Sequence, residues 1–418
     1  MKTVHRRGAG ARPAEARRFR PRPRASARDA FTRSLANAFA LLCLVLAAAG
    51  GAAAQAGDRV GKLERAASLI VGGRLEEAER QLNEVLKGEP EDAQALNMLG
   101  ALRAKQGRLD EAEALLARAV GRDGGMTSAR MNLAHLRLLK GEPEKAAAEL
   151  REVLRLEPSN AEAGHRLAWL LLRQGKLDEC IALAESLRGT RGASAPLLAV
   201  LGEARLKKGD ARAAVSAFER AVELDPAEPA YHFALGSAWL RQERPDLDAA
   251  EPSFRRFLKL RPDDAQGQLH LGYVLLKQKR HAEARQWLEK LVRADRATPE
   301  AFYYLGLIAQ GENDDARAVE LFGRSIQLAP TFYHAHVALG ATHLKLKDYE
   351  RARLSLEAGV RLSPEEPKAH YNLALLYARL KQPERAREEM SIVERLKGEG
   401  KTRAGDGDED NVAPPPPR

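Results

Sequence analysis

Apolar side chains recur three and four positions apart along most of the chain, which is the spacing of one face of an α-helix. Leu96, Leu99 and Leu102 form one such series, and a second series runs from Ala112 to Ala119. Gly107 lies between them, where a residue without a side chain can end a helix in a left-handed conformation. The pattern therefore predicts two short helices joined by a tight turn.

The same pair of helices repeats with a period of 34 residues. A Leu followed by Gly or Ala marks the repeats, with one gap of 36 residues: Leu99-Gly100, Leu133-Ala134, Leu167-Ala168, Leu201-Gly202, Leu235-Gly236, Leu271-Gly272, Leu305-Gly306, Leu339-Gly340 and Leu373-Ala374. Twelve positions after most of these pairs comes a second small residue: Ala112, Ala146, Cys180, Ala214, Ala284, Ala318, Ala352 and Ala386. Many repeats then close with a proline: Pro90, Pro158, Pro226, Pro262, Pro330 and Pro364.

Each of these positions has a physical reason. Small residues at the eighth and twentieth positions of a repeat let two antiparallel helices approach closely, and a proline stops the second helix. One hairpin cannot bury its apolar face alone, so stacked neighbours must complete the core. In the sixth repeat we expect Gly236 to face Ala250, and the two extra residues to lengthen the turn around residues 243–248.

This spacing of small residues, bulky apolar residues and closing prolines resembles the tetratricopeptide repeat. The resemblance covers ten consecutive repeats: 59–92, 93–126, 127–160, 161–194, 195–228, 229–264, 265–298, 299–332, 333–366 and 367–400. It implies an all-α fold, a superhelical solenoid of about twenty helices in ten hairpins. Residues 401–418 are rich in Gly, Asp and Pro, and we expect this tail to be disordered.

Positive charge is concentrated at the start of the chain. The 418 residues have a formal charge of +10, but residues 1–34 hold eleven of the 68 Lys and Arg and only two of the 58 Asp and Glu. The remainder therefore has 57 basic and 56 acidic residues. A surface that binds phosphates electrostatically needs an excess of positive charge, so we expect no nucleic-acid partner.

An apolar segment follows the basic one. Leu35–Ala49 is uncharged and the next residues are small, which is typical of a secretory signal peptide. We expect residues 1–56 to be the signal, with cleavage after Ala56, and the rest to be exported to the periplasm or outside the cell. Alternatively, Leu35–Ala54 stays uncleaved as an inner-membrane anchor, and the body is exported as well.

The sequence shows no catalytic or cofactor-binding motif: no phosphate-binding glycine loop, no H-E-x-x-H and no paired cysteines. Three histidines, His336, His343 and His370, share helical or repeat spacing, but a zinc site needs at least three converging ligands. We interpret them as packing residues. Of the two cysteines, Cys43 lies in the signal and Cys180 takes a small-residue position. We therefore expect no enzyme, no cofactor and no metal.

In the tetratricopeptide family, the first helices line a concave groove through the second, fifth, sixth, ninth and thirteenth positions of each repeat. Carried over to this sequence, the fifth, sixth and ninth positions give these candidates: Asn97, Asn132, His165, Arg166, Trp169, Phe233, Tyr273, Tyr303, Tyr304, Tyr371 and Asn372. The thirteenth position gives a row of basic residues: Lys105, Arg173, Lys207, Arg241, Lys277, Lys345 and Arg379. Aromatic anchors beside positive charge suit an extended acidic or aromatic peptide. Alternatively, the basic row only complements helix dipoles.

A clamp for C-terminal carboxylates, found in some members of the family, matches only at Asn132 and Arg166, and Glu162 lies where it would repel a carboxylate. The leading hypothesis is a non-enzymatic scaffold that binds protein partners in the cell envelope. One alternative is a recruiting or regulatory subunit of a separately encoded envelope biosynthesis or secretion machine. Another is a carbohydrate- or peptidoglycan-binding module that uses Trp169, Tyr273 and Tyr303. If the ring of Tyr303 projects into the groove, we expect Tyr303→Ala to weaken partner binding and to leave folding nearly intact.

Overall fold

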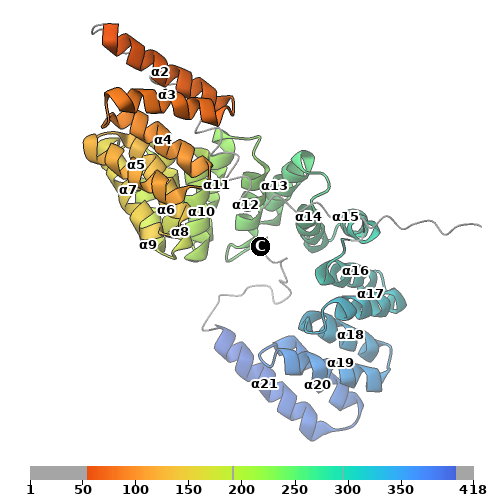
Figure 1. The fold of residues 1–418 in the computed structure, drawn as a ribbon. Coiled ribbons are helices and arrows are strands. Elements are labelled where there is room, and N and C mark those ends of the chain that lie inside the picture. Colours follow the sequence, from red (N-terminus) through yellow and green to blue (C-terminus); the bar gives the residue numbers. More distant parts are fainter. Residues whose placement is uncertain (1–53, 191–192, 295, 402–418) are drawn as a thin grey trace, which may run out of the picture. The chain divides into compact units, whose positions relative to one another are not determined.

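A computed structural model describes residues 54–190, 193–294 and 296–401 of the chain (Figure 1). The segment 1–53, which holds most of the expected signal and Cys43, and the tail 402–418 lie outside the described residues. The first described helix begins at Ala54, so the expected cleavage after Ala56 falls in its first turn. Among the helices described, none combines the length and the apolar character that crossing a membrane requires.

The described residues form twenty helices and no strand, which confirms the all-α prediction. The helices are α2 (Ala54–Val71), α3 (Leu75–Gly88), α4 (Ala93–Lys105), α5 (Leu109–Arg122), α6 (Thr127–Leu139), α7 (Pro143–Leu156), α8 (Ala161–Arg173), α9 (Leu177–Arg188), α10 (Ala195–Lys207), α11 (Ala211–Leu224), α12 (Pro229–Leu240), α13 (Leu247–Leu260), α14 (Ala265–Lys277), α15 (His281–Arg293), α16 (Pro299–Gly311), α17 (Asp315–Leu328), α18 (Tyr333–Lys345), α19 (Tyr349–Leu362), α20 (Pro367–Arg379) and α21 (Pro383–Lys401).

Two compact units divide the chain after Gly141, and each is described by itself. Unit one contains α2 to α6, and unit two contains α7 to α21. Within each unit a helix packs mainly against the helices next to it in the sequence, as α4 does on α5 and α16 on α17. First helices of neighbouring hairpins also touch, for example α4 with α6 and α14 with α16. This order of packing is that of a helical repeat array.

The turn between the two helices of a hairpin depends on one left-handed residue. Gly107 has a φ of 79°, and the backbone N–H of Arg108 donates to the carbonyl of Arg103 at 2.9 Å, which closes the end of α4. Gly141, Gly175 and Gly209 have the same left-handed backbone, as the sequence predicts.

Small residues allow the close approach within each hairpin. A Cβ atom added to Gly236 of α12 would lie 2.8 Å from the ring of Phe254 in α13. The sequence predicts Ala250 opposite Gly236, and the atoms nearest to the added Cβ belong to Phe254. Ala250 is fully buried, but the ring of Phe254 occupies the space over the glycine. The ring fits because the glycine has no side chain.

The sixth repeat holds its two extra residues in the turn between α12 and α13, at residues 241–246. Asp246 ends this longer turn: its backbone N–H donates to the carbonyl of Trp239 at 3.2 Å, and its carboxylate accepts from the N–H of Ala249 at 2.9 Å. The insertion therefore lengthens the turn, as the sequence predicts, but the turn spans residues 241–246 rather than 243–248 because α13 begins at Leu247.

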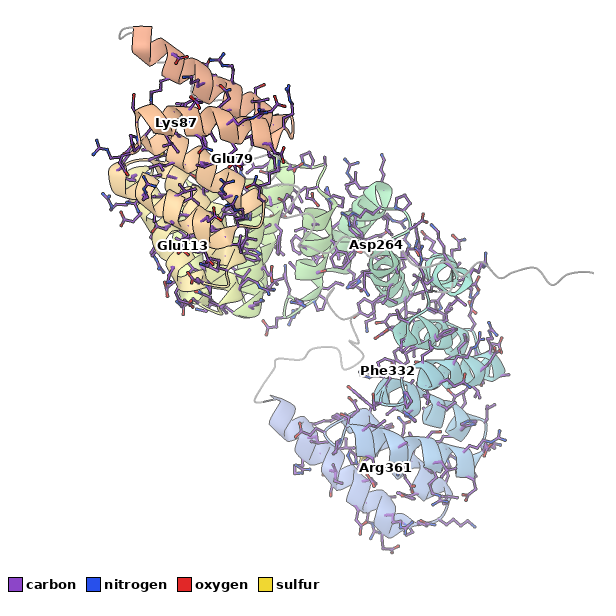
Figure 2. The ribbon with its side chains drawn as sticks, in the orientation of Figure 1. Glu79, Lys87, Glu113, Asp264, Phe332 and Arg361 are labelled. Atoms are coloured by element: carbon purple, nitrogen blue, oxygen red, sulfur yellow. The ribbon has the colours of Figure 1, made fainter. Side chains whose placement is uncertain are left out.

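Ion pairs link successive helices of unit one, and Figure 2 labels two of the carboxylates, Glu79 and Glu113. Arg103 of α4 binds Glu79 of α3 at 2.6 Å, and Lys140, which follows α6, binds Glu113 of α5 at 2.6 Å. Both pairs join the second helix of one hairpin to the first helix of the next.

Candidate functional site

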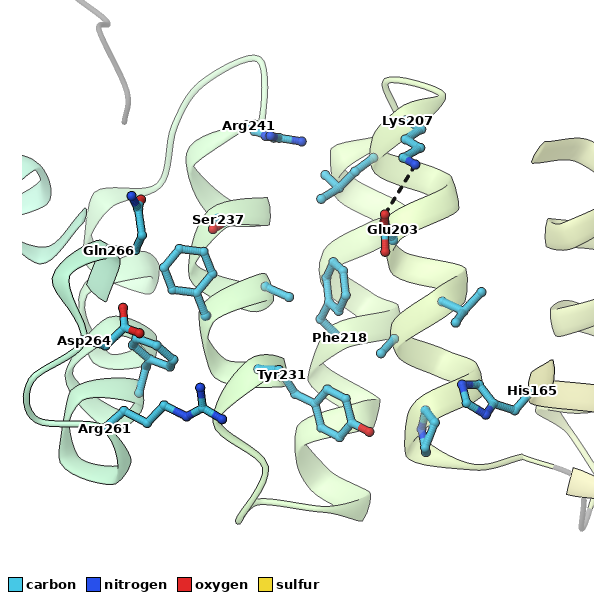
Figure 3. A pocket seen from close by; sticks show the side chains of 18 residues that line it. His165, Glu203, Lys207, Phe218, Tyr231, Ser237, Arg241, Arg261, Asp264 and Gln266 are labelled. Atoms are coloured by element: carbon cyan, nitrogen blue, oxygen red, sulfur yellow. Dashed lines mark ion pairs between the residues drawn. The ribbon is translucent and has the colours of Figure 1, made fainter. Parts of the chain in front are cut away.

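A pocket of about 770 Å³ opens among the first helices of unit two (Figure 3). We call it the α12 pocket, because residues from both ends of α12 line it. Its lining residues are His165, Pro196, Ala199, Val200, Glu203, Leu206, Lys207, Phe218, Ala230, Tyr231, Phe233, Ala234, Ser237, Arg241, Phe257, Arg261, Asp264 and Gln266. Twelve of these 18 residues occupy the second, fifth, sixth, ninth or thirteenth position of a repeat.

Small side chains on two helices create the hollow. Ala199 of α10 and Ala234 of α12 leave space where larger residues would fill the groove. The rings of Phe218, Phe233 and Phe257 line the pocket, and Phe233 packs edge to face against Phe257 with ring centroids 5.1 Å apart. The interior of the pocket is therefore mainly apolar and aromatic.

Two polar atoms in the pocket have no hydrogen-bond partner among the described residues. They are the hydroxyl oxygen of Ser237 and the amide oxygen Oε1 of Gln266, and both atoms are buried. Buried polar atoms are nearly always paired in folded proteins, with protein, water or ligand. Ser237 and Gln266 thus each bring one buried oxygen atom, unpaired within the described chain, to the lining of the pocket.

Charged residues lie at both ends of the pocket. Arg241 and Arg261 are exposed, and in Figure 3 they lie at opposite ends. On the wall formed by α10, Glu203 and Lys207 form an ion pair with a separation of 3.4 Å. The α10 wall therefore compensates its own charge, whereas no ion pair within the described chain is found for the two arginines.

Burial affects the titration of two other lining residues. It raises the pKa of Tyr231 to about 12, with smaller contributions from Glu228 and Asp225. It lowers the pKa of His165. At neutral pH both side chains are therefore neutral, so each can offer a hydrogen bond but no charge.

Four aromatic candidates for the groove are buried in the hydrophobic core, and one of them, Phe233, also lines the α12 pocket. Tyr273 and Tyr304 are each 1% exposed, and Phe233 and Tyr303 are each 7% exposed. Tyr303 packs edge to face against Phe332, with ring centroids 5.4 Å apart. Neighbouring rings cover this side chain, so the condition under which Tyr303→Ala would leave folding intact is not met. Buried rings also offer no surface on which a sugar could stack.

Four of the polar candidates bind other residues of the chain. In unit one, the amide of Asn132 donates to the side-chain oxygen of Asn97 at 2.8 Å. In unit two, Arg166 is 7% exposed and forms an ion pair with Glu162, one helical turn away. The same carboxylate that would repel a bound C-terminus thus neutralises the arginine. Asn372, also buried, donates to the carbonyl of Lys368 at 2.8 Å.

The remaining candidates lie nearer the surface. Arg173 stacks over the half-buried ring of Trp169, with its guanidinium carbon 5.7 Å from the ring centroid. Tyr371 is 44% exposed and Arg379 is exposed, whereas Lys277 is half-buried. The basic row coincides with helix C-termini, since α4, α8, α10, α14, α18 and α20 each end at one of its members. Lys345 binds Asp315 at 2.9 Å, so that member has a partner within the chain.

The histidines make structural hydrogen bonds. The Nε2 atoms of His336 and His370 lie 2.9 Å from the carbonyl oxygens of Pro330 and Pro364, which close the preceding repeats. His343 is buried. Within the ranges that the structure describes, no group of three His, Cys, Asp or Glu side chains is placed to hold a metal ion.

Cys180 fills the small-residue position as the sequence predicts. Its side chain is fully buried, and its thiol lies 3.2 Å from the carbonyl oxygen of Ala168. Burial raises the pKa of the thiol to about 11, with a smaller contribution from Glu203. A thiol with this pKa is protonated at neutral pH and is a poor nucleophile.

Several residues that line the α12 pocket are not among the groove candidates predicted from the sequence. Four of them lie at groove positions but are small or uncharged, unlike the aromatic and charged candidates: Ala199, Ala234, Ser237 and Gln266. Their positions in the repeat are the feature of the sequence that could have predicted a place in the groove. Arg261 follows a second helix, so the groove positions do not include it.

Comparison with known proteins supports the repeat assignment. One family model, described as tetratricopeptide repeat, matches residues 63–127, 200–248, 246–299 and 337–398. A second model with the same description matches residues 103–155 and 137–204. Together the matches cover well over half of the chain. Both models describe a repeat that generally acts as a scaffold rather than as a catalyst.

Two curated proteins match part of the chain. Protein FlbA of Caulobacter vibrioides is 33% identical over 164 residues, which is 38% of this chain and 27% of FlbA. Cellulose synthase operon protein C of Xanthomonas axonopodis pv. citri is 32% identical over 146 residues, which is 33% of this chain and 9% of that protein. The matches thus span less than a third of either relative.

Among solved structures, the APC/C hetero-tetramer Cut9-Hcn1 is similar to this chain. The sequence identity is 16%, the match covers 81% of this chain and 80% of the other, and the TM-score is 0.47.

Proposed function

Because the chain belongs to the tetratricopeptide repeat family, we propose that it is a non-enzymatic scaffold whose first helices bind an extended segment of a partner protein. The observation that carries the proposal is the α12 pocket. Residues at groove positions of four consecutive repeats line it, and two buried polar atoms in it have no partner among the described residues. A hollow of this kind offers a partner both apolar burial and hydrogen bonds.

The proposed site of action is the cell envelope. The basic start of the chain followed by Leu35–Ala54 supports export, either with cleavage or as an inner-membrane anchor. With cleavage after Ala56, the mature chain would begin at Gly57. Intact-mass measurement of the native protein, together with fractionation of the cells, tests this step. Retention of residues 1–34 in a soluble cytoplasmic form would contradict it.

A recruiting subunit of a separately encoded machine is a second form of the same proposal. The partial match to a protein named after a cellulose synthase operon favours it. Co-purification of the chain with one catalytic partner would distinguish such a subunit from a scaffold with several partners.

Site-specific photo-crosslinking in living cells tests the scaffold function. A photoreactive phenylalanine analogue replaces Ala230, which is exposed and lines the α12 pocket, or Arg212, which is exposed on α11 and does not line it. We expect a defined protein to crosslink at position 230 and not at position 212. If both positions give the same products, or neither gives any, the proposed binding along the first helices is wrong.

A further inference from the structure

We propose that the α12 pocket binds a peptide segment in which one large aromatic side chain lies between two carboxylates. The inference rests on the proposed function and adds the chemistry of the partner. Three features of the pocket carry it: its apolar interior, its two polar atoms without partners, and its two arginines.

The apolar interior of the pocket fits an aromatic side chain of the bound segment. Ala199 and Ala234 leave the space open, and Phe218 and Phe257 line it from the second helices. Aromatic side chains bury about 150–250 Å² each and pack edge to face or offset against other rings. A pocket of about 770 Å³ holds such a side chain together with the main chain that carries it.

The two buried oxygen atoms of Ser237 and Gln266 can form hydrogen bonds with a polypeptide main chain. The amide oxygen of Gln266 accepts hydrogen bonds, and the hydroxyl of Ser237 can donate or accept. An extended segment presents an N–H and a carbonyl at each residue. Binding such a segment would satisfy both buried atoms, whereas a purely apolar ligand would leave them unpaired.

The positive charges of Arg241 and Arg261 favour a carboxylate at each end of the bound segment. Arg241 follows the last residue of α12, and Arg261 lies at the other end of the pocket, near Tyr231 in the first turn of the helix (Figure 3). The ten residues from position 231 to position 241 rise about 15 Å along the helix. An extended chain covers this length in four to five residues. Because the arginine and carboxylate side chains can extend toward each other, the two carboxylates should lie four to six residues apart.

The same arginines suit a nucleic acid less well. Glu203 and Asp264 also line the pocket, and the carboxylate of Asp264 already accepts from the N–H of Gly267 at 3.0 Å as the cap of α14. A continuous row of phosphates would pass close to these carboxylates and be repelled. The chain's own tail is a weaker candidate, because residues 402–418 contain four acidic residues but no aromatic one.

Fluorescence polarisation with labelled peptides and the full chain tests the proposal. The lead probe has nine residues, with a central Trp and an Asp three positions to either side in a Ser and Gly background. Matched probes replace both Asp by Lys, replace Trp by Ala, or place the two Asp next to the Trp. We expect the lead probe to bind at least about tenfold more tightly than each of the others.

Variants of the chain locate the binding. Arg241→Gln and Arg261→Gln should each weaken the lead probe about tenfold, and Ala234→Trp, which fills the hollow, should abolish its binding. Arg256→Gln is the matched control, because Arg256 is exposed on α13 and does not line the pocket. Ser237→Leu provides a second filling variant, and helicity with thermal melting shows that each variant folds.

Each other outcome overturns the proposal. Equal binding of the Lys and Asp probes would show that the arginines do not bind carboxylates of the peptide. Binding that persists in both Ala234→Trp and Ser237→Leu would show that the peptide binds outside the pocket. Tighter binding of a peptide with the sequence 402–418, or of a single-stranded oligonucleotide, assigns the pocket to that ligand. If position 230 crosslinks a partner but no probe binds, only this inference fails. If the crosslink is absent as well, the proposed function fails too.

Discussion

Nine turn residues among those described have a positive φ, and four of them are not glycine. Gly107 represents the first group, whereas Lys279, Asn313, Lys347 and Lys381 have φ angles of 59–63°. A residue with a Cβ atom loses about 1–2 kcal/mol in this left-handed region. The later hairpins therefore keep the same turn geometry with less favourable residues.

Replacing one of these lysines by glycine should stabilise the chain. Lys347 is exposed, so Lys347→Gly removes the left-handed penalty, partly offset by the greater entropy of glycine in the unfolded state. We expect the free energy of unfolding to rise by about 0.5–1 kcal/mol. Urea unfolding measures this. Lys259→Gly, within α13, should instead destabilise the protein by up to about 1 kcal/mol.

A buried histidine should make stability depend on pH. Burial lowers the pKa of His270 to about 4; a hydrogen bond to the carbonyl of Gln266 and the charge of Asp264 oppose the shift, and Arg241 adds to it. The unfolded chain binds a proton near pH 6.5, whereas the folded chain does so only near pH 4. Stability is therefore full above about pH 6.5 and falls as the pH decreases to about 4, by at most roughly 3 kcal/mol.

Urea unfolding at several pH values between 7 and 4 checks this expectation. His270→Gln should give a shallower fall in the free energy of unfolding over that window, whatever its stability at pH 7. Part of the fall should remain, because burial also lowers the pKa of His334 to about 4. A variant with the full pH dependence of the native chain would show that His270 does not cause it.

At the scale of the element, each hairpin depends on a contact between a glycine or alanine of the first helix and a larger side chain of the second. Added Cβ atoms on Gly202, Gly272 and Gly306 would each lie within 2.7 Å of a Phe or Leu side chain. The small residue and the large one form a pair, so a change on one helix cannot be absorbed without movement of the other.

Gly236→Leu should overpack the hairpin of α12 and α13. The new side chain would meet the ring of Phe254, and we expect a loss of roughly 1–3 kcal/mol. Gly323→Leu is the matched control, because a Cβ atom there meets nothing within 4 Å. Thermal and urea unfolding measure both variants, and equal losses would disprove the packing explanation.

Tyr303→Ala should destabilise the hairpin of α16 and α17. The ring is 7% exposed and packs against Tyr304, Phe322 and Phe332, so its removal leaves a cavity and should cost roughly 2–4 kcal/mol. Tyr371→Ala, at a 44% exposed ring, should change stability by less than about 0.5 kcal/mol. Urea unfolding that finds both variants alike would refute the core assignment of Tyr303.

At the scale of the whole molecule, contacts run mainly between helices adjacent in sequence and between neighbouring hairpins. Stability in such an array is close to a sum of hairpin terms and nearest-neighbour terms. A local defect therefore spreads only as far as the hairpins that touch it.

Hydrogen exchange can measure how far a defect spreads in unit two. A Cβ atom added to Gly306 would lie 2.4 Å from the ring of Phe322, so Gly306→Leu should loosen α16 and α17 and the hairpins beside them. The amides of α7 to α10, several hairpins away, should keep their native protection. Uniform loss of protection throughout unit two would mean that the array unfolds as a single cooperative body.

The sequence by itself determined the hairpin, its period and its turn. Gly107 ends a helix because it adopts a left-handed backbone, and Gly236 lets the second helix pack closely because it has no side chain. Both reasons lie within one repeat and recur along the chain. Periodic local constraints of this kind leave a pattern that can be read along the chain. The family positions of the groove were available for the same reason.

Only the tertiary structure decided which groove positions are open. Tyr273, Tyr303 and Tyr304 fill their part of the groove and cover one another, whereas Ala199 and Ala234 leave a hollow between α10 and α12. The same repeat positions thus become core in one place and pocket in another. The outcome depends on the sizes of side chains that meet from different repeats, because volume is shared between neighbours and no single repeat contains that information.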